Sequence, residues 1–307
     1  MVLSKSNSYF LSTNLPASTF QTYFSEMKCA LDLLNQSSIL QKMSTGSAEI
    51  DSLIDGVQGS SFYLFYGSHQ NQLILDSLLY RQLIGCILPK SKKKNGFESA
   101  AMFLNNIDFS IDRNKHQLLN PEKIAIASKY AGIEPKIVFK NLFVQTAYNQ
   151  EHQVEIAQEI SEKIEINPDI KLLAIRDLTK YLVRNKDPNW NTNDDANTLK
   201  NALGTIYRAC IKNKVAIIAT GSCNTANSGI IPKPIGGTYL KHIANVIVHL
   251  KPNFWSSTIN NNNNSGSPYV SFKASMIKHP YQRTPKSVNF YAKRIGKRMN
   301  PMLFILD

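Results

Sequence analysis

The sequence has few cysteines, no long apolar run and almost no acidic residues in its last third. Its four cysteines, Cys29, Cys86, Cys210 and Cys223, form no C-x-x-C pair. This excludes a disulfide scaffold and a zinc finger and suggests a reducing compartment. No apolar run approaches the roughly 18 residues that a membrane-spanning helix needs, and residues 1–10 lack the apolar core of a signal peptide. We therefore expect a soluble, cytoplasmic protein that has no membrane partner.

Acidic residues are nearly absent from the C-terminal part of the chain. From Arg208 to Asp307 there are fourteen Lys and Arg side chains and one acidic side chain, so this part carries the whole net charge of +13. Folding requires no net charge, whereas basic side chains placed on phosphates release condensed counterions. The asymmetry favours a nucleic-acid partner, and with it a nucleoid-associated location. The alternative is a solvated basic face.

Short apolar runs alternate with amphipathic segments through most of the chain. They predict strands at 62–66, 100–104, 142–145, 172–175, 215–219 and 246–250, and helices between them, for example at 152–164 and 196–212. Short buried strands separated by helices are typical of a parallel sheet covered on both faces. Residues 269–276 and 288–292 alternate as antiparallel strands do. The predicted fold is α/β, with a mostly parallel sheet and antiparallel strands at its C-terminal edge.

Five segments resemble, in order and spacing, the archaeal-type RadA branch of the RecA superfamily, the strand-exchange recombinases. They are Ser44–Leu53 (STGSAEIDSL), Phe65–Gly67, Phe143–Gln153 (FVQTAYNQEHQ), Lys171–Thr179 (KLLAIRDLT) and Lys233–Leu250 (KPIGGTYLKHIANVIVHL). The resemblance implies a RecA-like P-loop NTPase core at residues 44–292. An N-terminal arm or linker would occupy residues 1–43, and a basic tail would occupy residues 293–307.

The phosphate loop of this family is altered. Such a loop needs glycines, a lysine for the β- and γ-phosphates and a Ser or Thr hydroxyl for Mg²⁺. The matching stretch, Gly67-Ser68-His69-Gln70-Asn71, is about three residues shorter and has a single glycine. On this alignment Gln70 stands for the lysine and Asn71 for the hydroxyl residue. The sequence therefore predicts a degenerate nucleotide site.

Two further catalytic positions are substituted on the same resemblance. Ile107 stands where the family has the glutamate that activates water, and Arg176 where it has the aspartate that supports Mg²⁺, with Asp177 next to it. We expect no catalytic residue, no metal site and no cofactor. The alternative is weak residual binding of ATP and Mg²⁺. Arg176 either pairs with nearby acidic groups and closes the site, or is an exposed arginine at a strand end.

The resemblance implies DNA contacts in two loops and in the basic C-terminal part. Basic and aromatic side chains suit phosphates and bases, and we expect a sequence-independent grip on single-stranded DNA. The candidates are Arg184, Lys186 and Trp190 in the first loop, Lys233, Gly236, Gly237 and Lys241 in and after the second, and Lys278, Arg283, Lys293, Arg294, Lys297 and Arg298 further on.

An oligomerisation motif of the family is partly retained. Family filaments form when a Phe-x-x-Ala linker docks on the neighbouring core as an added strand. The matching positions are Met27 and Ala30. They suggest docking onto an active RadA-type recombinase. Alternatively, both residues belong to the buried face of a short helix.

Together these features predict a catalytically inactive RadA-like paralogue, a pseudo-ATPase. It would act as a DNA-binding or filament-modulating accessory factor in homologous recombination and DNA repair. One alternative is a divergent DNA-dependent ATPase and strand-exchange recombinase that completes its ATP site from a neighbouring subunit. The other is a protein-only partner of the active recombinase.

Overall fold

A nine-stranded sheet organises the molecule. The structure, a computed structural model, describes residues 41–91, 96–107, 119–182, 192–223, 231–253, 269–295 and 303–306. The strand order is β11-β10-β9-β8-β3-β7-β6-β4-β5. The parallel strands are β3 (Phe62–Gly67), β4 (Ala100–Asn106), β5 (Leu142–Ala147), β6 (Ile170–Arg176), β7 (Ala216–Ser222) and β8 (Val246–Pro252).

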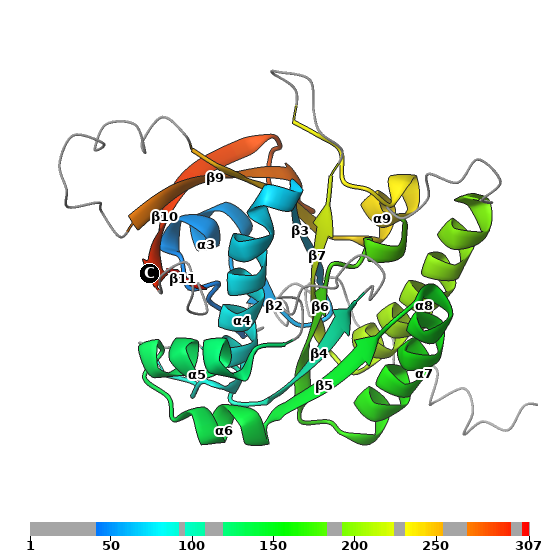
Figure 1. The fold of residues 1–307 in the computed structure, drawn as a ribbon, viewed down its shortest axis with the longest axis horizontal. Coiled ribbons are helices and arrows are strands. Elements are labelled where there is room, and N and C mark those ends of the chain that lie inside the picture. Colours follow the sequence, from blue (N-terminus) through cyan, green and yellow to red (C-terminus); the bar gives the residue numbers. More distant parts are fainter. Residues whose placement is uncertain are drawn as a thin grey trace, which may run out of the picture. The chain divides into compact units, whose positions relative to one another are not determined.

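Helices cover both faces of the sheet (Figure 1). On one face lie α3 (Ala48–Ile54), α4 (Gln72–Ile87), α5 (Pro121–Tyr130) and α6 (Pro135–Lys140). On the other lie α7 (Gln150–Ile166), α8 (Thr192–Lys212) and α9 (Gly237–Ile243). Side chains of β3 alternate between the two cores, with Phe65 on the α4 side and Leu64 on the α8 side. This two-sided burial explains why the central strands are continuous apolar runs.

Local sequence signals set the ends of these helices. Asn149 caps α7 by accepting a hydrogen bond from the His152 N–H at 2.7 Å. Three isoleucines at intervals of four residues, from Ile156 to Ile164, then face the sheet. Asn120 caps α5 in the same way, before a proline at the first helical position. None of the helices in the described part of the chain is long and apolar enough to cross a membrane.

The segment that enters the core is held together by one carboxylate. Asp51 of α3 accepts hydrogen bonds from the Thr45 N–H and the Thr45 hydroxyl, both at 2.7 Å. It also accepts one from the Ser44 hydroxyl at 2.5 Å. The short antiparallel pair β1 (Lys42–Met43) and β2 (Val57–Gln58) flanks this helix. The Ser-Thr-Gly-Ser stretch at Ser44–Ser47 therefore forms a turn that leads into the N-terminus of α3.

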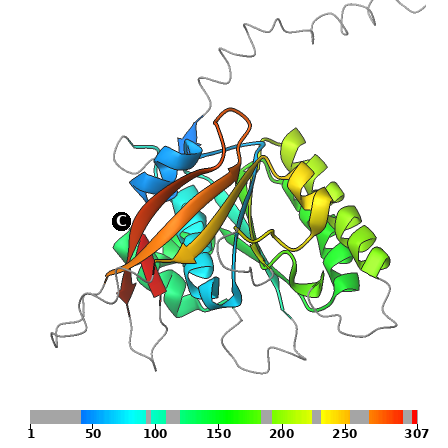
Figure 2. The same ribbon diagram turned by 90° about the horizontal axis from the view of Figure 1, so that it is seen from above.

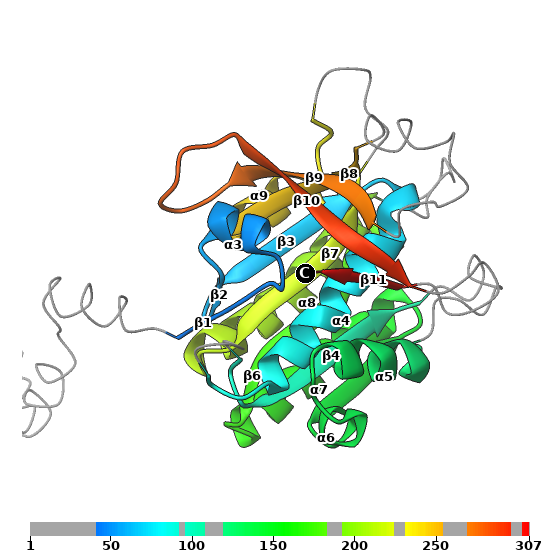
Figure 3. The same cartoon turned by 90° about the vertical axis from the view of Figure 1, so that its left-hand side faces the viewer.

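Three antiparallel strands extend the sheet beyond β8. They are β9 (Tyr269–Lys278), β10 (Lys286–Ile295) and β11 (Leu303–Leu306), and α3 packs on β10 (Figure 3). The sheet runs past residue 292, where the sequence suggested that a basic tail begins. Leu303 and Leu306 of β11 are buried, and the Phe304 N–H donates to the Ser77 hydroxyl of α4 at 3.0 Å. Burial of this apolar strand explains the difference.

Candidate functional site

The residues of the degenerate nucleotide site come together at one edge of the sheet. Gly67 ends β3, Ile107 follows β4, and Arg176 ends β6 with Asp177 next along the chain. Because neighbouring parallel strands end at the same edge, this is where ligands of open α/β sheets bind. The structure therefore brings these sequence-predicted positions to one edge, and their assignment to a nucleotide site stays a prediction.

The loop after Gly67 is a short turn held against β8. It runs from Ser68 through the 3₁₀ turn η1 (His69–Asn71) into α4, with His69 and Gln70 exposed. The Asn71 amide does not cap α4. It donates instead to the Leu250 carbonyl oxygen at 2.9 Å. A Cβ atom on Gly67 would lie 2.9 Å from that same oxygen, so the glycine is needed for close approach to β8.

Arg176 forms a buried ion pair with a carboxylate of α4. Its Nε donates to Asp76 Oδ1 at 2.8 Å and its Nη2 to Asp76 Oδ2 at 3.1 Å, a bidentate arrangement. Arg176 is only 5% exposed and Asp76 only 8%. Of the two alternatives for Arg176, the structure shows the internal pair. The guanidinium faces the protein interior at the position where the family has an acidic residue.

Polar groups around this pair complete its hydrogen bonding. Asp76 Oδ1 also accepts from the Gln72 side chain at 2.8 Å. Burial by itself would lower the pKa of Arg176, but the Asp76 carboxylate outweighs it and the pKa is raised. Burial lowers the pKa of the Lys123 ammonium, which also interacts with Asp76. Burial and the same carboxylate raise the pKa of Tyr80. Asp76 is thus the centre of a small buried charge network.

The other substituted positions serve the fold. The Ile107 side chain is buried, and its carbonyl oxygen lies 3.0 Å from the Tyr181 hydroxyl. Asn106, one residue earlier, donates to the Arg176 carbonyl oxygen at 2.9 Å. The Asp177 N–H donates to the Thr220 hydroxyl at 2.9 Å, and its carboxylate lies 3.8 Å from the Lys180 ammonium. Asp177 itself lies just beyond β6 and has a left-handed backbone with φ +47°.

These residues do not fit a magnesium–nucleotide complex. Gln70 carries no charge for a phosphate, Arg176 is already held by Asp76, and Ile107 cannot accept a proton from water. Within the described ranges, no group of three or more His, Cys, Asp or Glu side chains is placed to hold a metal ion. At this edge of the sheet the described side chains of Gln70, Ile107 and Arg176 offer no free positive charge and no proton acceptor to a bound nucleotide.

The candidate DNA contacts of the second loop are only partly described. Lys233 is exposed, and Lys241 lies on α9. Gly236 has φ +106° and begins α9, and a Cβ atom there would lie 2.9 Å from the Leu240 side chain. Gly237 has φ +64° and faces open space. Both glycines therefore hold a left-handed backbone that other residues rarely adopt, and at Gly236 a side chain would also lack space.

Lys278 has a structural task that the sequence did not suggest. Its ammonium donates to the carbonyl oxygens of Lys241, His242 and Ala244 at 2.8, 3.1 and 2.7 Å. These oxygens are the unpaired acceptors at the end of α9. A lysine has three N–H donors, so this set engages all of them. The expected DNA contact of Lys278 stays a prediction, beside this structural role.

The remaining candidates divide into exposed and undescribed residues. Arg283 and Arg294 are exposed, and the Lys293 ammonium lies 5.9 Å from the centre of the Tyr130 ring. Met27, Ala30, Arg184, Lys186, Trp190, Lys297 and Arg298 lie outside the described residues.

Sequence reasoning missed Asp76 and Lys251, and it did not predict that Lys251 of β8 stands opposite Lys273 of β9. Asp76 had a signal: it is the only acidic residue within the apolar stretch that forms α4.

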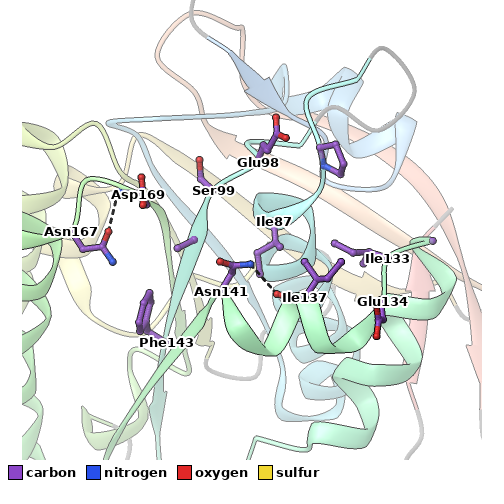
Figure 4. Close-up of a pocket in the computed structure, with 13 residues that line it drawn as sticks. Ile87, Glu98, Ser99, Ile133, Glu134, Ile137, Asn141, Phe143, Asn167 and Asp169 are labelled. Atoms are coloured by element: carbon purple, nitrogen blue, oxygen red, sulfur yellow. Dashed lines mark hydrogen bonds between the residues drawn. The ribbon is translucent and has the colours of Figure 1, made fainter.

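A cavity of the described residues lies elsewhere, at the amino edge of the sheet (Figure 4). It has a volume of about 710 Å³ and is lined at the starts of β4, β5 and β6 and by α6. Glu98, Glu134 and Asp169 give it an acidic lining, and none of its thirteen lining residues is basic. It is therefore separate from the carboxyl edge and opposite in charge to the C-terminal strands.

The fold and the position of the degenerate site define a RecA-like core. A family model described as Rad51 matches residues 36–258, so the chain belongs to the Rad51 family. It is 26% identical over 224 residues to the DNA repair and recombination protein RadA of Methanococcus voltae, covering 71% of this chain and 68% of that protein. It is 28% identical over 159 residues to the protein of the same description from Methanococcus maripaludis, covering 50% of this chain and 47% of that protein. The RecA-like fold inferred from the sequence is confirmed.

Proposed function

We propose that this chain is a catalytically inactive member of the Rad51 family that acts as a DNA-binding or filament-modulating accessory factor in recombination and repair. The matching relatives are described as DNA repair and recombination proteins. The observation that carries the inactivity is the buried Arg176–Asp76 pair at the carboxyl edge. It occupies with internal charges the place where the family resemblance calls for a magnesium-supporting carboxylate.

The Arg176–Asp76 ion pair holds the site in a form that does not accept a nucleotide. Breaking one partner of a buried ion pair is costly because the other charge stays unpaired. To recruit Arg176 to a phosphate, the protein would have to leave Asp76 buried without its partner. The phosphates of ATP would therefore find no lysine in the loop that follows Gly67, and Arg176 would be unavailable because it is paired with Asp76.

The basic C-terminal strands support the DNA-binding half of the proposal. No acidic residue occurs between Arg208 and Leu306, and Lys233, Arg283 and Arg294 are exposed. Exposed charges of one sign attract a polyanion through counterion release, without reading its sequence. The candidates Arg184, Lys186, Trp190, Lys297 and Arg298 belong to the same proposal.

Thermal melting tests the nucleotide half. MgATP at about 1 mM should leave the melting temperature unchanged. If ATP bound with a Kd about a hundred times lower than this concentration, it would add ~2.7 kcal/mol of stability and raise the melting temperature. Single-stranded DNA at low salt, as the positive control, should raise it. Saturable binding of MgATP in the low micromolar range by calorimetry would contradict the proposal. Phosphate release with DNA present would favour an active recombinase.

Fluorescence anisotropy tests the DNA half. Affinity for a labelled oligothymidylate should fall linearly with the logarithm of salt concentration, as for a site that holds several phosphates. If the full chain shows no binding at low salt, DNA is not its partner. A protein-only partner of an active recombinase would then be the better description, and Met27 and Ala30 would be the first positions to vary.

A further inference from the structure

The strands β8, β9 and β10 have two different faces. One face packs against α3 and α4 and is apolar, with Leu250, Phe272 and Phe290 buried in the core. The other face points outward and carries the alternate residues. Figure 2 shows the three strands, in gold, orange and dark red, in front of α3 and α4. On this face Lys251, Asn289 and Tyr291 are exposed and Lys273 is half-buried, whereas His249, Ser271 and Ser275 are buried between longer side chains. The exposed residues are the surface that these strands offer to a partner.

Two lysines stand directly opposite each other on the outward face. Lys251 of β8 pairs in register with Lys273 of β9, and Asn289 of β10 continues the row. Neither ammonium has an ion-pair partner among the described residues. Like charges at directly opposite positions of an antiparallel pair destabilise a sheet. The sheet gains nothing from this arrangement, whereas a bound anion would relieve the repulsion.

An exposed tyrosine stands beside the lysine row. Tyr291 of β10 lies two residues from Asn289 along the same face and is 56% exposed. Its cross-strand neighbour is Ser271, a small residue that leaves the ring uncovered. The next position of β9 on this face beyond Lys273 is Ser275, which is also small and accepts a hydrogen bond from Ser287 at 2.9 Å. The lysine stems and the tyrosine ring therefore rise above a floor of small side chains.

We propose that the outward face of β8, β9 and β10 binds single-stranded DNA, with Lys251 and Lys273 on the phosphates and Tyr291 stacked on a base. This proposal rests on the proposed DNA-binding function and names the surface that performs it. Residues two apart on a strand are about 7 Å apart, which suits successive contacts along an extended chain. Lysines on the backbone and an aromatic ring on a base are the usual elements of sequence-independent single-strand binding.

Charge supports nucleic acid over a protein partner. No Asp or Glu occurs in β8, β9 or β10, so nothing on this face repels a phosphate. Lys251 lies at the carboxyl end of β8, the same edge at which the neighbouring parallel strands β3 and β7 end. The face therefore continues the edge from which the family resemblance derives DNA contacts, but it uses different residues.

The decisive variant is Tyr291→Ala, tested by anisotropy with a labelled oligothymidylate of about 15 nucleotides. Loss of one stacked base should weaken binding about 5- to 100-fold and leave the salt slope unchanged. Tyr291→Phe should retain the affinity, because the ring and not the hydroxyl stacks. Tyr148→Ala is the matched control, since Tyr148 is 45% exposed but lies next to the opposite edge strand, β5. Binding of duplex DNA should not change with Tyr291→Ala, because paired bases are already stacked.

The double variant Lys251→Gln/Lys273→Gln tests the phosphate contacts. It should reduce the slope of log K against log salt by about 0.7 for each lysine. It should also be at least as stable as the wild type without DNA, because the like-charge pair is removed. Lys136→Gln/Lys140→Gln, two exposed lysines of α6, is the matched control and should leave the slope unchanged.

The outcomes separate this surface from the proposed function. If the wild type binds but both sets of variants bind equally well, this surface is wrong and the DNA-binding function stands. If the wild type does not bind at low salt, both proposals fail. Tighter binding of an oligouridylate than of the oligothymidylate would overturn DNA as the ligand and assign the face to RNA.

Discussion

The carboxyl edge near α4 and the outward face of β8 to β10 differ in how their charged side chains are placed and paired. At the edge, Arg176 and Asp76 are buried and fully paired. On the face, Lys251 and Lys273 stand opposite each other without a described ion-pair partner. A buried charge must be paired to be tolerated, whereas an exposed charge needs no partner. The first arrangement is thus explained by the fold alone, whereas the directly opposed lysines on the face do not stabilise the sheet.

The same difference appears in the distribution of charge along the chain. Residues 1–207 hold equal numbers of basic and acidic side chains, and the later residues hold the whole excess. Within the described core, the Arg176–Asp76 pair at the carboxyl edge belongs to the interior. Lys251, Arg283 and Arg294 in the C-terminal part are exposed, as the proposed contact with a polyanion requires. The predictions below test this division.

The largest effect is expected from Asp76→Ala. This variant leaves Arg176 buried without its carboxylate, and removal of one partner of a buried ion pair costs ~3–5 kcal/mol of unfolding free energy. Urea unfolding followed by circular dichroism measures it. Glu165→Ala, which breaks the exposed pair with Lys212, is the control and should cost less than ~1 kcal/mol. If both variants lowered the unfolding free energy by the same amount, the Arg176–Asp76 pair would be no more buried from water than the exposed Lys212–Glu165 pair.

A double variant identifies the origin of that cost. Asp76→Leu/Arg176→Met replaces both charges by apolar side chains, and such replacements of buried pairs are often neutral or stabilising. We expect it to be more stable than Asp76→Ala. If it is less stable, the pair contributes more than mutual neutralisation. The contacts of Gln72 and Lys123 with Asp76 would then contribute to stability as well.

The sequence predicted the sheet well because its strands are buried on both faces. The runs at 62–66 and 172–175 are apolar without interruption and lie within β3 and β6. It also placed Gly67, Ile107 and Arg176 at one edge, because parallel strands end together. It did not predict β11, since a four-residue apolar segment after a basic stretch has no periodicity of its own.

Side-chain partners were less accessible to sequence reasoning. Asp76 and Arg176 are 100 positions apart, and only the packing of α4 on β6 brings them together. Lys278 looked like other exposed lysines of the basic region, because the carbonyl oxygens that it binds come from the end of α9. Pairing across strands, which opposes Lys251 to Lys273, depends on a register that a local pattern does not determine.

A smaller effect is expected at Lys278, which tests whether it belongs with the buried charges. Lys278→Gln removes charge-assisted hydrogen bonds to three carbonyl oxygens and should cost ~1–3 kcal/mol. Chemical unfolding is the measurement. Lys286→Gln, at an exposed position of β10, should stay within ~0.5 kcal/mol of the wild type. A Lys278→Gln variant of wild-type stability with weakened DNA binding would restore the original interpretation of this lysine.

His249 gives a pH-dependent test at the border of the two regions. Burial and then the charge of Lys251 lower the pKa of His249 to about 4. In the unfolded chain the pKa is about 6.5, so between these values the unfolded state binds the proton more readily. Stability should be fully present above pH 6.5 and fall as the pH drops towards 4, by ~1–2 kcal/mol after solvent screening. His249→Gln should flatten this part of the pH profile, and an unchanged profile would contradict the assignment.

The smallest effect on stability is expected where the charges are most exposed. Arg283→Gln/Arg294→Gln should alter the unfolding free energy by less than ~0.5 kcal/mol, because neither side chain has a described ion-pair partner. The same variant should reduce the salt slope of single-strand binding, as expected when phosphate contacts are lost. If the variant lost stability and the salt slope of DNA binding did not change, Arg283 and Arg294 would be structural side chains like Arg176. The contrast between buried and exposed charge would then no longer separate structural side chains from those that meet DNA.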